Sequence, residues 1–555
     1  MAETLPITAA TVPQTPMVLA PTDPVAQSIQ ALLLPLDRSV SAAMPAQTMT
    51  HQRLDVALAV AEFYRNRAYA AVWSDDRDTT QLLEGLSGLE ADGLAPGDFQ
   101  LAELSAAKAS LTDATPAAER GRFDVAATSA YVSALLQLRR GKVDPATLDM
   151  QWNFDPAGVD PREEVSGLFD ALLAHDVANA FRQAPPQMTI YSRMRMALAQ
   201  LRETQARGGW PLVEPTQVLK FGVIDPAVTQ LRLRLIAGGY LDASLPLQDR
   251  YDEIVVSAVR KYQSEQYLSA DGVVSRETLA SLNVPVQVRI DQVRVNLERA
   301  RWLLYKLQGT FVIVDIAGYK VALYRDGQPI WRSRVQVGKP FRSTPVFQAE
   351  ITYITFNPTW TVPPTILKND VLPQILKNPR YLDAHRIQVL NGTGEVIDPA
   401  TVNWHKPGGV TLRQQAGPEN SLGQVVIRFP NPYAIYLHDT PHRELFNQNR
   451  RATSSGCIRV ENPLQLVELL FNDPVRWNAA AIQEQLATGV TTNINLPVKV
   501  PVLLAYWTVD LQDDARLSFK PDVYGHDRVV LQALNRPVST AFALPEQAQT
   551  GRAAY

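Results

Sequence analysis

The hydrophobic pattern of this chain of 555 residues changes its period at Gly309, and that change limits the folds open to it. Before Gly309, apolar residues such as Leu54, Leu58, Ala61 and Tyr64 recur every three or four positions, which is the period of a helix. After Gly309, short runs of β-branched and aromatic residues are separated by glycine-containing turns, which is typical of strands. The chain is also too long for a single core. The sequence therefore predicts a multidomain α + β protein that is helical first and β-rich later.

Breaker residues and shifts in composition divide the chain into predicted segments. Residues 1–48 are rich in Pro, Thr, Ala and Gln and show no sustained period, which predicts a flexible lead-in. The following segments are a helical scaffold domain (49–220), a three-helix module (221–285), a connecting helix (286–308), a β-rich domain (309–495) and a C-terminal β extension with a tail (496–555). Many Gly, Pro and Asn residues interrupt the β-rich domain at about 373–423. We interpret this stretch as an inserted capping segment, with a disordered surface loop as the alternative.

The three-helix module carries the clearest local signals of the helical half. Asp225 opens its first helix, and Gly238 ends it. A turn from Asp271 leads to Ser275, which is the predicted N-cap of the last helix. This order of helices and turns resembles the peptidoglycan-binding-like module. The residues alone leave open whether the module binds cell wall or acts as a structural spacer.

Charge and hydropathy exclude several classes of partner. The formal net charge is −3, so nothing favours nucleic acid or an anionic membrane surface as a partner. No apolar run approaches the roughly 18–20 residues that a membrane span requires. The chain begins with Met1 and a Pro/Thr/Ala-rich stretch, without a secretory signal. We therefore expect that an N-terminal signal or anchor absent from this sequence exports the protein.

Cys457 is the only cysteine in the sequence. One thiol cannot form an intramolecular disulfide or a site with several thiolate ligands, and we expect neither a metal nor another cofactor. Taken alone, a single cysteine is usually a small buried apolar residue. A lone thiol also suits an oxidising compartment, where a second cysteine could trap it in a disulfide.

The surroundings of Cys457 point instead to a nucleophile. His438 ends an alternating apolar stretch that begins at Ala434, and the segment from Ser454 to Cys457 reads Ser-Ser-Gly-Cys. A free thiol is only a few per cent thiolate at neutral pH, so a reactive cysteine needs a nearby imidazole or a positive field. Gly456 permits a tight turn, and its backbone N–H with that of Cys457 is a candidate donor pair for an oxyanion.

A histidine followed by Ser/Thr-x-Gly-Cys is the signature of the YkuD-type L,D-transpeptidases, which this chain resembles. Many members have a second histidine before Gly-Cys, and here that place is taken by Ser455, as in the larger periplasmic members of the YcbB type. The resemblance to these larger members extends to Phe-Asn-Pro-Thr-Trp-Thr-Val-Pro-Pro at 356–364 and to the segment 417–441. It also covers the scaffold, the module and the insertion.

The resemblance implies a mechanism for Cys457. Its thiolate attacks the carbonyl that joins meso-diaminopimelate to the terminal D-Ala of a tetrapeptide stem, and His438 carries the proton to the leaving amine. The backbone carbonyl of Asp439 orients the imidazole in place of a carboxylate. The amine of a second meso-diaminopimelate then resolves the thioester and forms the cross-link.

Four further residues are predicted to bind substrate: Tyr436, Trp360, Ser455 and Arg459. Tyr436 precedes His438 by two positions and should share its face of the strand. Trp360 is predicted to form an apolar wall, or alternatively to belong to an ordinary core. Arg459 is predicted to bind a substrate carboxylate, with a structural salt bridge to Glu461 or another acid as the alternative. Two more histidines, His405 and His442, are expected at the surface.

The predicted partners are peptidoglycan stem peptides, carbapenem-type inhibitors at Cys457 and other cell-wall enzymes, in the periplasm. Two alternatives to the transpeptidase remain open from the sequence. An L,D-carboxypeptidase or cysteine amidohydrolase would form the same acyl-enzyme and use water as the acceptor. A non-catalytic peptidoglycan-binding scaffold would need no reactive Cys457.

Overall fold

The structure is a computed structural model that describes residues 21–42, 56–148, 152–153, 161–304, 307–378, 380–512, 514, 516–538 and 542–544. Two compact units make up the chain. The first contains residues 1–140, 156–185 and 536–555, and the second contains residues 141–155 and 186–535. No helix of the described residues has the length and hydropathy needed to cross a lipid bilayer.

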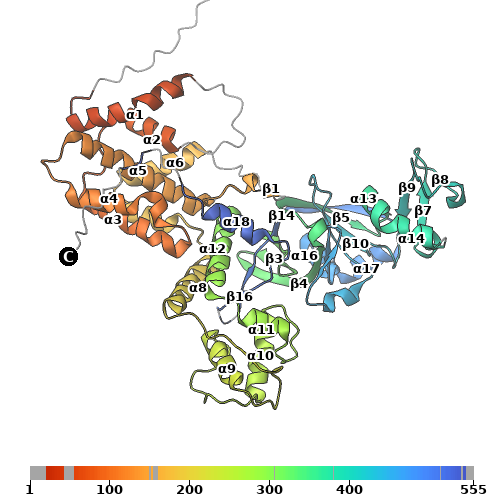
Figure 1. The fold of residues 1–555 in the computed structure, drawn as a ribbon. Coiled ribbons are helices and arrows are strands. Elements are labelled where there is room, and N and C mark those ends of the chain that lie inside the picture. Colours follow the sequence, from red (N-terminus) through yellow and green to blue (C-terminus); the bar gives the residue numbers. More distant parts are fainter. Residues whose placement is uncertain are drawn as a thin grey trace, which may run out of the picture. The chain divides into compact units, whose positions relative to one another are not determined.

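The first unit is a helical bundle built around one long central helix, α5 (Figure 1). Its helices are α1 (Pro24–Ala42), α2 (Val56–Asn66), α3 (Asp76–Gly88), η1 (Leu89–Asp92), η2 (Pro96–Phe99), α4 (Leu101–Ser110), α5 (Ala117–Arg140), α6 (Pro161–Leu173) and α7 (Val177–Gln183). Helices α1 to α4 and α6 all pack against α5. This explains why α5 is buried on most of its surface rather than along one stripe.

Helix α1 contradicts the predicted flexible lead-in at residues 1–48. Val25, Ile29 and Leu33 follow one another at four-residue steps, and all three side chains are buried. They place an apolar stripe of α1 against α5. The Pro- and Thr-rich flanks masked this short helical period in the sequence. Most of the remaining lead-in lies outside the described residues.

Asp124 forms a buried polar cluster in the middle of the bundle. Its carboxylate accepts hydrogen bonds from the Tyr64 hydroxyl at 2.6 Å and from the backbone N–H groups of Val72 at 3.0 Å and Trp73 at 2.9 Å. The Trp73 indole N–H donates to the Thr128 hydroxyl at 2.8 Å. The cluster thereby ties α2 and the loop after it to α5.

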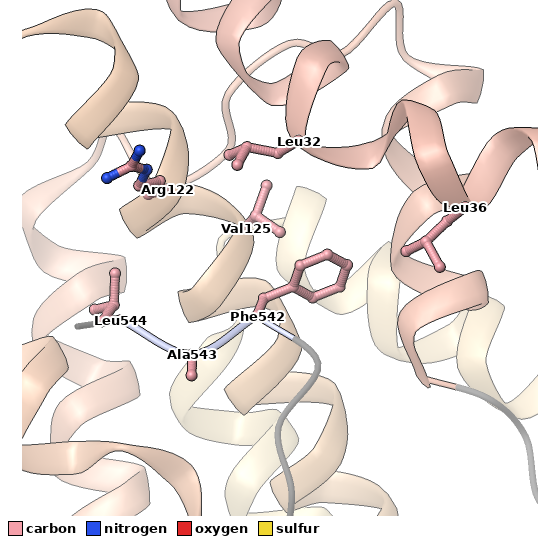
Figure 2. A pocket seen from close by; sticks show the side chains of 7 residues that line it. All are labelled: Leu32, Leu36, Arg122, Val125, Phe542, Ala543 and Leu544. Atoms are coloured by element: carbon pink, nitrogen blue, oxygen red, sulfur yellow. The ribbon is translucent and has the colours of Figure 1, made fainter. Parts of the chain in front are cut away.

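A cavity of about 370 Å³ lies between α1, α5 and a short segment near the C-terminus (Figure 2). It is lined by Leu32, Leu36, Arg122, Val125, Phe542, Ala543 and Leu544. The Gln100 side chain holds the C-terminal segment, because the Leu544 N–H donates to its Oε1 at 2.7 Å. Arg122 is the only charged residue of this lining, and the lining holds no nucleophile, so the cavity is not a candidate active site.

The predicted scaffold boundary at residue 220 is too far along the chain. Helix α8 (Thr189–Ala206) belongs to the second unit, where it packs on α12 (Val286–Leu303). Leu198 and Leu297 are buried in their shared core. The helical period predicted α8 correctly but could not identify its packing partner.

The three-helix module consists of α9 (Pro226–Ala237), α10 (Glu253–Glu265) and α11 (Arg276–Leu282). The predicted N-cap of α11 is confirmed, because the Thr278 N–H donates to the Ser275 hydroxyl at 3.3 Å. The Tyr267 hydroxyl donates to the Asp510 carboxylate at 3.0 Å, which joins the module to the β-rich domain.

The β-rich domain is one large sheet that closes on itself. Its strands are β1 (Trp152–Asn153), β2 (Thr310–Asp315), β3 (Lys320–Arg325), β4 (Gln328–Gly338), β5 (Val346–Phe356), β10 (Val425–Arg428), β11 (Leu437–His438), β12 (Ala452–Ser454), β13 (Ile458–Val460) and β14 (Thr492–Ala505). Their order is β1-β5-β10-β11-β13-β4-β3-β2-β14, and β12 pairs with β4. The ring closes because β14 also pairs with β5. The predicted C-terminal extension at residues 496–555 is therefore wrong for β14, which belongs to this ring.

Alternating residues of these strands divide the sheet into an apolar and a polar face. Ile427, Leu437, Ile458 and Val335 are buried in the apolar core, which α16 (Pro463–Phe471) and α17 (Ala479–Ala487) complete. Within each strand, the residues that flank these apolar positions point to the opposite face of the sheet. This polar face carries the candidate site.

The insertion is an ordered subdomain. It contains β6 (Trp360–Thr361), α13 (Pro364–Ile366), η6 (Leu367–Val371), α14 (Leu372–Lys377), α15 (Tyr381–Ala384), β7 (Ile387–Leu390), β8 (Val396–Ile397), η7 (Pro399–Thr401) and β9 (Thr411–Gln414). Its strands form a separate sheet in the order β6-β9-β7-β8 over their own apolar core. The predicted start at about 373 was therefore late, and the disordered-loop alternative was wrong.

The remaining elements are short. They are η3 (Pro145–Thr147), η5 (Pro340–Arg342), η8 (Arg443–Asn447), the paired strands β15 (Val509–Leu511) and β16 (Leu517–Phe519), and α18 (His526–Leu534).

Candidate active site

The pairing of β11 with β13 brings the predicted nucleophile and base to one face of the sheet. The two strands run parallel, and His438 lies opposite Arg459. The Ile458 N–H donates to the Tyr436 carbonyl at 3.1 Å, which continues the same register and sets Tyr436 opposite Cys457. Paired residues of neighbouring strands point to the same side. Cys457, Tyr436, His438 and Arg459 therefore share the polar face.

Strand β11 is shorter than the sequence predicted. The expected strand from Ala434 to His438 contains only Leu437 and His438. Ala434 has a φ of 54°, in the left-handed region, so the chain turns there and becomes extended only afterwards. His438 is still the last residue of the strand.

The turn before Cys457 is held by three hydroxyl contacts. Gly456 has a φ of 117°, a conformation that side-chain-bearing residues rarely adopt. The Ser454 hydroxyl accepts from the Gly456 N–H at 3.1 Å and donates to the Cys457 carbonyl at 2.6 Å. The Thr344 hydroxyl donates to the Gly456 carbonyl at 2.7 Å. These contacts fix the direction in which the thiol leaves the turn.

The same contacts contradict one predicted role. The Gly456 N–H was expected to face an oxyanion, but it is engaged by Ser454. Among the described residues, none accepts a hydrogen bond from the Cys457 N–H. Of the two predicted donors, only the Cys457 N–H is thus open to a ligand.

The Cys457 thiol is partly exposed and lies in a mixed environment. Burial of the thiol raises its pKa, whereas hydrogen bonds from Tyr436 and the charges of Arg428 and Arg459 lower it. The net shift is upward. Since the thiol is not ionised by its surroundings alone, it needs a proton acceptor at the moment of attack.

His438 is suited to be that acceptor because it is kept neutral. Its side chain is buried, and burial together with the charge of Arg459 lowers its pKa to about 3. Its Nδ1 lies 2.6 Å from the Asp439 carbonyl oxygen, and the Leu422 backbone also hydrogen bonds to the ring. A carbonyl can only accept, so Nδ1 carries the proton in that contact and Nε2 keeps a lone pair.

Two arginines lie on the polar face beside this pair. The guanidinium carbon of Arg428 is 4.6 Å from the centre of the Tyr436 ring. Arg459 donates to the Gln336 amide oxygen at 3.2 Å, and its buried Nε has no hydrogen-bond partner among the described residues. The alternative salt bridge of Arg459 with Glu461 was wrong.

Glu461 pairs instead with Arg334 at 2.5 Å. Sequence reasoning missed Arg428 altogether. Its place opposite Tyr436 follows from the pairing of β10 with β11, and no local motif marks it.

Two of the residues predicted to bind substrate, Trp360 and Ser455, make contacts that the sequence did not predict for a binding site. Trp360 is partly buried and packs against the core of the inserted subdomain, as the alternative interpretation expected, and its role as a wall of the site stays a prediction. Ser455 is exposed, and its hydroxyl accepts a hydrogen bond from Arg342 at 2.8 Å. Arg342 also pairs with Asp370 of the insertion at 2.5 Å.

His405 and His442, the two histidines predicted at the surface, are both exposed. His442 is 62% exposed and lies 3.7 Å from Glu444, and His405 is exposed on the insertion.

Among the described residues, metal-ligand spacing occurs at Asp75, Asp78 and His175 of the scaffold, far from Cys457 in the sequence. The His175 Nδ1 and an Asp78 carboxylate oxygen lie 2.5 Å apart, and this hydrogen bond raises the pKa of His175. His175 engages only one carboxylate oxygen of Asp78, and the other, Oδ1, is buried without a hydrogen-bond partner among the described residues.

A second cavity, of about 240 Å³, lies behind the loop that contacts His438. It is lined by Asn357, Ala416, Gly417, Pro418, Gly423, Gln424, Leu486 and Gly489. This lining contains no titratable side chain, so the cavity offers no chemistry of its own.

Three family models match the chain. Residues 309–492 match the L,D-transpeptidase catalytic domain of the YkuD family, residues 58–198 match a scaffold domain, and residues 225–282 match the "Putative peptidoglycan binding domain". A Haemophilus influenzae protein named "Putative L,D-transpeptidase" is 34% identical over 273 residues, which cover 48% of this chain and 55% of that protein. The chain thus spans about half the length of the curated relative it matches.

Solved structures add little to this assignment. A crystal structure of an L,D-transpeptidase from Xylanimonas cellulosilytica is 16% identical, covers 53% of this chain and 99% of its own, and gives a TM-score of 0.15. A second, from Stackebrandtia nassauensis, is 13% identical, covers 53% and 96%, and gives 0.20. Scores this low carry no argument, so the assignment depends on the family models and the curated relative. The chain therefore contains an L,D-transpeptidase catalytic domain of the YkuD family at residues 309–492, together with a scaffold domain and a peptidoglycan-binding domain.

Proposed function

We propose that this protein is a cysteine acyltransferase that cross-links two peptidoglycan stem peptides through their meso-diaminopimelate residues. The observation that carries the proposal is the register of β11 and β13, which sets Cys457 and His438 on one polar face within a domain that matches the L,D-transpeptidase family. The cell-wall-acting domains favour an extracytoplasmic location, and we propose the periplasm.

In the first half-reaction, His438 Nε2 takes the proton of the Cys457 thiol as the sulfur attacks the carbonyl carbon of the donor meso-diaminopimelate. The Asp439 carbonyl holds the ring through Nδ1 and stabilises the imidazolium that forms. The Cys457 N–H donates to the developing oxyanion. Collapse of the intermediate breaks the peptide bond, and the leaving D-Ala amine receives the proton from His438.

In the second half-reaction, the side-chain amine of an acceptor meso-diaminopimelate attacks the thioester. His438 takes a proton from this amine and returns it to the departing sulfur, so the free enzyme is restored. Water in place of the amine would release a tripeptide and make the same site a carboxypeptidase. Tyr436 and Arg459 face the reacting groups from the same side of the sheet and are proposed to bind the donor.

The test is incubation of the purified protein with tetrapeptide muropeptides, followed by mass spectrometry of protein and products. We expect a transient mass increase on Cys457 and dimeric muropeptides with release of D-Ala. The substitution Cys457→Ala should abolish both, and His442→Ala, at an exposed histidine, should leave both unchanged. Tripeptides without dimers would favour the carboxypeptidase, and an effect independent of Cys457 would favour the non-catalytic scaffold.

A carbapenem provides a second probe of the nucleophile. It should form a covalent adduct at Cys457, and an adduct retained in Cys457→Ala would contradict the assignment. Other cell-wall enzymes are further proposed partners, for which co-purification with the peptidoglycan-binding domain intact is the measurement.

A further inference from the structure

One side-chain cluster of the scaffold has the spacing of a metal site and takes no part in the proposed acyl transfer. Asp75, Asp78 and His175 each offer one ligand atom, and these atoms lie within 4.8 Å of one another. The part of the chain that the structure describes contains no other such group of three or more ligands. We expected no metal because a single thiol cannot form a thiolate site, but one imidazole and two carboxylates need no thiolate.

Two neighbouring elements of the first unit bring the three residues together. Asp75 is the N-cap of α3, and Asp78 lies in the first turn of that helix. His175 comes from the turn between α6 and α7. The Ala178 N–H of α7 donates to the Gln81 side chain of α3 at 3.2 Å. This contact joins α3 to α7 without help from the cluster, so the fold itself sets the positions of the three ligands.

The buried carboxylate of Asp78 is the observation that points to a ligand. Its side chain is 0% exposed, so bulk water does not reach it. Its Oδ2 lies 2.5 Å from the His175 Nδ1, whereas Oδ1 is buried and has no hydrogen-bond partner among the described residues. Both oxygens belong to one carboxylate, so Oδ1 lies beside the contact with His175. A buried carboxylate oxygen without a partner is unfavourable, and a cation bound there supplies the missing interaction.

The other two residues have atoms available for an ion. The Asp75 Oδ1 accepts from the Arg77 N–H at 2.8 Å, and its second oxygen accepts no hydrogen bond from the described residues. His175 is 60% exposed, so the ring can keep its proton on Nε2 and offer the lone pair of Nδ1. Tetrahedral zinc ligands lie ~3.4 Å apart, so the contact between Nδ1 and Oδ2 must widen by about 0.9 Å. The exposed ring is free to make this shift.

We propose that Asp75, Asp78 and His175 bind a Zn²⁺ ion that clamps the start of α3 to the turn before α7. An imidazole ligand favours zinc over Ca²⁺ and Mg²⁺, which prefer ligand sets made of oxygen alone. Three protein ligands leave the fourth tetrahedral position to water. The site is independent of the acyl transfer proposed for Cys457, so its tests need no activity assay.

The alternative is a purely structural cluster, in which Asp75 caps a helix and His175 hydrogen bonds to Asp78. Asp75→Asn separates the two roles. Asparagine caps a helix as well as aspartate does, but its neutral amide is a much weaker zinc ligand than a carboxylate. His175→Gln removes the nitrogen ligand at an exposed position, so the packing of the bundle is little affected.

The first experiment is calorimetric titration of the metal-free full chain with ZnCl₂. We expect the Kd of the scaffold site to rise at least ~tenfold in Asp75→Asn and in His175→Gln, because loss of a group that only orients a ligand already costs that much. Glu84→Gln, at an exposed acid of α3, and His405→Gln, at an exposed histidine of the insertion, should change the Kd less than twofold. Unchanged affinity in both site variants would overturn the proposal.

The catalytic face must be separated from the scaffold in this titration, because zinc also binds thiolate and imidazole ligands. Cys457→Ala is therefore titrated in parallel and should keep the site that Asp75→Asn and His175→Gln weaken. Loss of zinc binding in Cys457→Ala would place the ion at the catalytic face and would reject the scaffold site.

The second experiment locates the clamp by hydrogen exchange. Amides of α3 and α7 that exchange only when the two elements separate should exchange about a hundredfold more slowly at a zinc concentration of about 100 times the Kd. Amides of α9, in the three-helix module, should not change, and His175→Gln should remove the protection. Ca²⁺ at the same concentration should protect far less. Zinc binding without slower exchange in α3 and α7, or equal protection by Ca²⁺, would contradict the inference.

Discussion

Two buried polar clusters in this protein are built in opposite ways. In the scaffold, Asp124 accepts from the Tyr64 hydroxyl and from two backbone N–H groups, so each of its oxygens has a partner. On the catalytic face, Arg428 and Arg459 have no acidic partner, and the Cys457 N–H has no acceptor among the described residues. The first cluster is complete in the free protein. In the proposed function, a ligand completes the second.

This difference separates polar groups that hold the fold from polar groups that act. A satisfied buried cluster joins distant segments and specifies one arrangement of helices. An unsatisfied one lowers the stability of the free protein and becomes favourable only when a substrate supplies the missing charges and acceptors. Substitutions in the first cluster should therefore change stability, and substitutions in the second should change chemistry.

The largest expected effect is that of Cys457→Ala. Removal of the nucleophile should reduce cross-link formation at least ~10⁴-fold, because no other thiol exists in the chain to replace it. The free energy of unfolding should change by less than ~1 kcal/mol, since the side chain is small and partly exposed. Product analysis by mass spectrometry and thermal unfolding check the two parts. A large loss of stability would show that the catalytic face also holds the fold.

Replacement of His438 should have the next largest effect. His438→Gln removes the proton acceptor, and we expect the acylation rate to fall by ~10²- to 10⁴-fold. Rapid-quench mass spectrometry of the acyl-enzyme measures this rate. His442→Gln, at an exposed histidine near it in the sequence, is the matched control and should change the rate less than twofold. Equal losses in both variants would contradict the assigned base.

Asp124→Ala should affect the scaffold and spare the site. The substitution leaves the N–H groups of Val72 and Trp73 without their acceptor, which should destabilise the bundle by ~2–4 kcal/mol. Hydrogen exchange of the α2 and α5 amides measures the loss locally, which matters because a chain of several domains does not unfold in two states. Iodoacetamide labelling of Cys457 should keep its rate within about twofold of wild type. A slower labelling rate would mean that the two clusters are coupled.

Acid pH should shift the two clusters in opposite directions, and this is the smallest expected effect. Burial lowers the pKa of His438 to about 3, below the unfolded value of ~6.5, so the unfolded chain binds the extra proton between these values. The contribution of His438 to stability should fall as the pH drops below ~6.5, by at most ~1.4 kcal/mol per pH unit.

Burial raises the pKa of Asp124, so its contribution should instead rise as the pH drops through its folded pKa. Hydrogen exchange of β11 and of α5 across this pH range separates the two contributions. His438→Gln should remove the first slope only, and a slope that persists in that variant would assign it to another group.

Local sequence signals predicted those features of the structure that depend on interactions between residues close in the sequence. Ser275 was identified as a helix cap from its own turn, and the apolar periods predicted most helices and strands to within a few residues. Cys457 and His438 were predicted as nucleophile and base because a reactive thiol needs particular neighbours, and both belong to one motif. Their shared face follows from two adjacent strands.

Interactions between distant segments were not predictable in the same way. Arg428 meets Tyr436 only through the register of β10 and β11, and a shift of one residue would turn it to the apolar face. The Gly456 N–H has the sequence position expected of an oxyanion donor, but it donates to the Ser454 hydroxyl. The local sequence could not show which of the two acceptors it would bind. Trp360 was predicted to form a pocket wall because no local motif indicates that the insertion has its own core.

The late position of strand β14 in the sequence affects how the catalytic domain folds during synthesis. It pairs with β2 at the beginning of the catalytic domain and with β5 in its middle, and it lies mostly beyond the residues that match the family model. A growing chain therefore cannot complete its ring when Cys457 leaves the ribosome. Strand β14, one pairing partner of β2 and of β5, is complete only when the chain reaches Ala505, and such late, long-range pairing slows folding. The reactive thiol is consequently synthesised before the fold that controls it, and a chain cut after residue 492 would carry the whole catalytic motif on an open sheet.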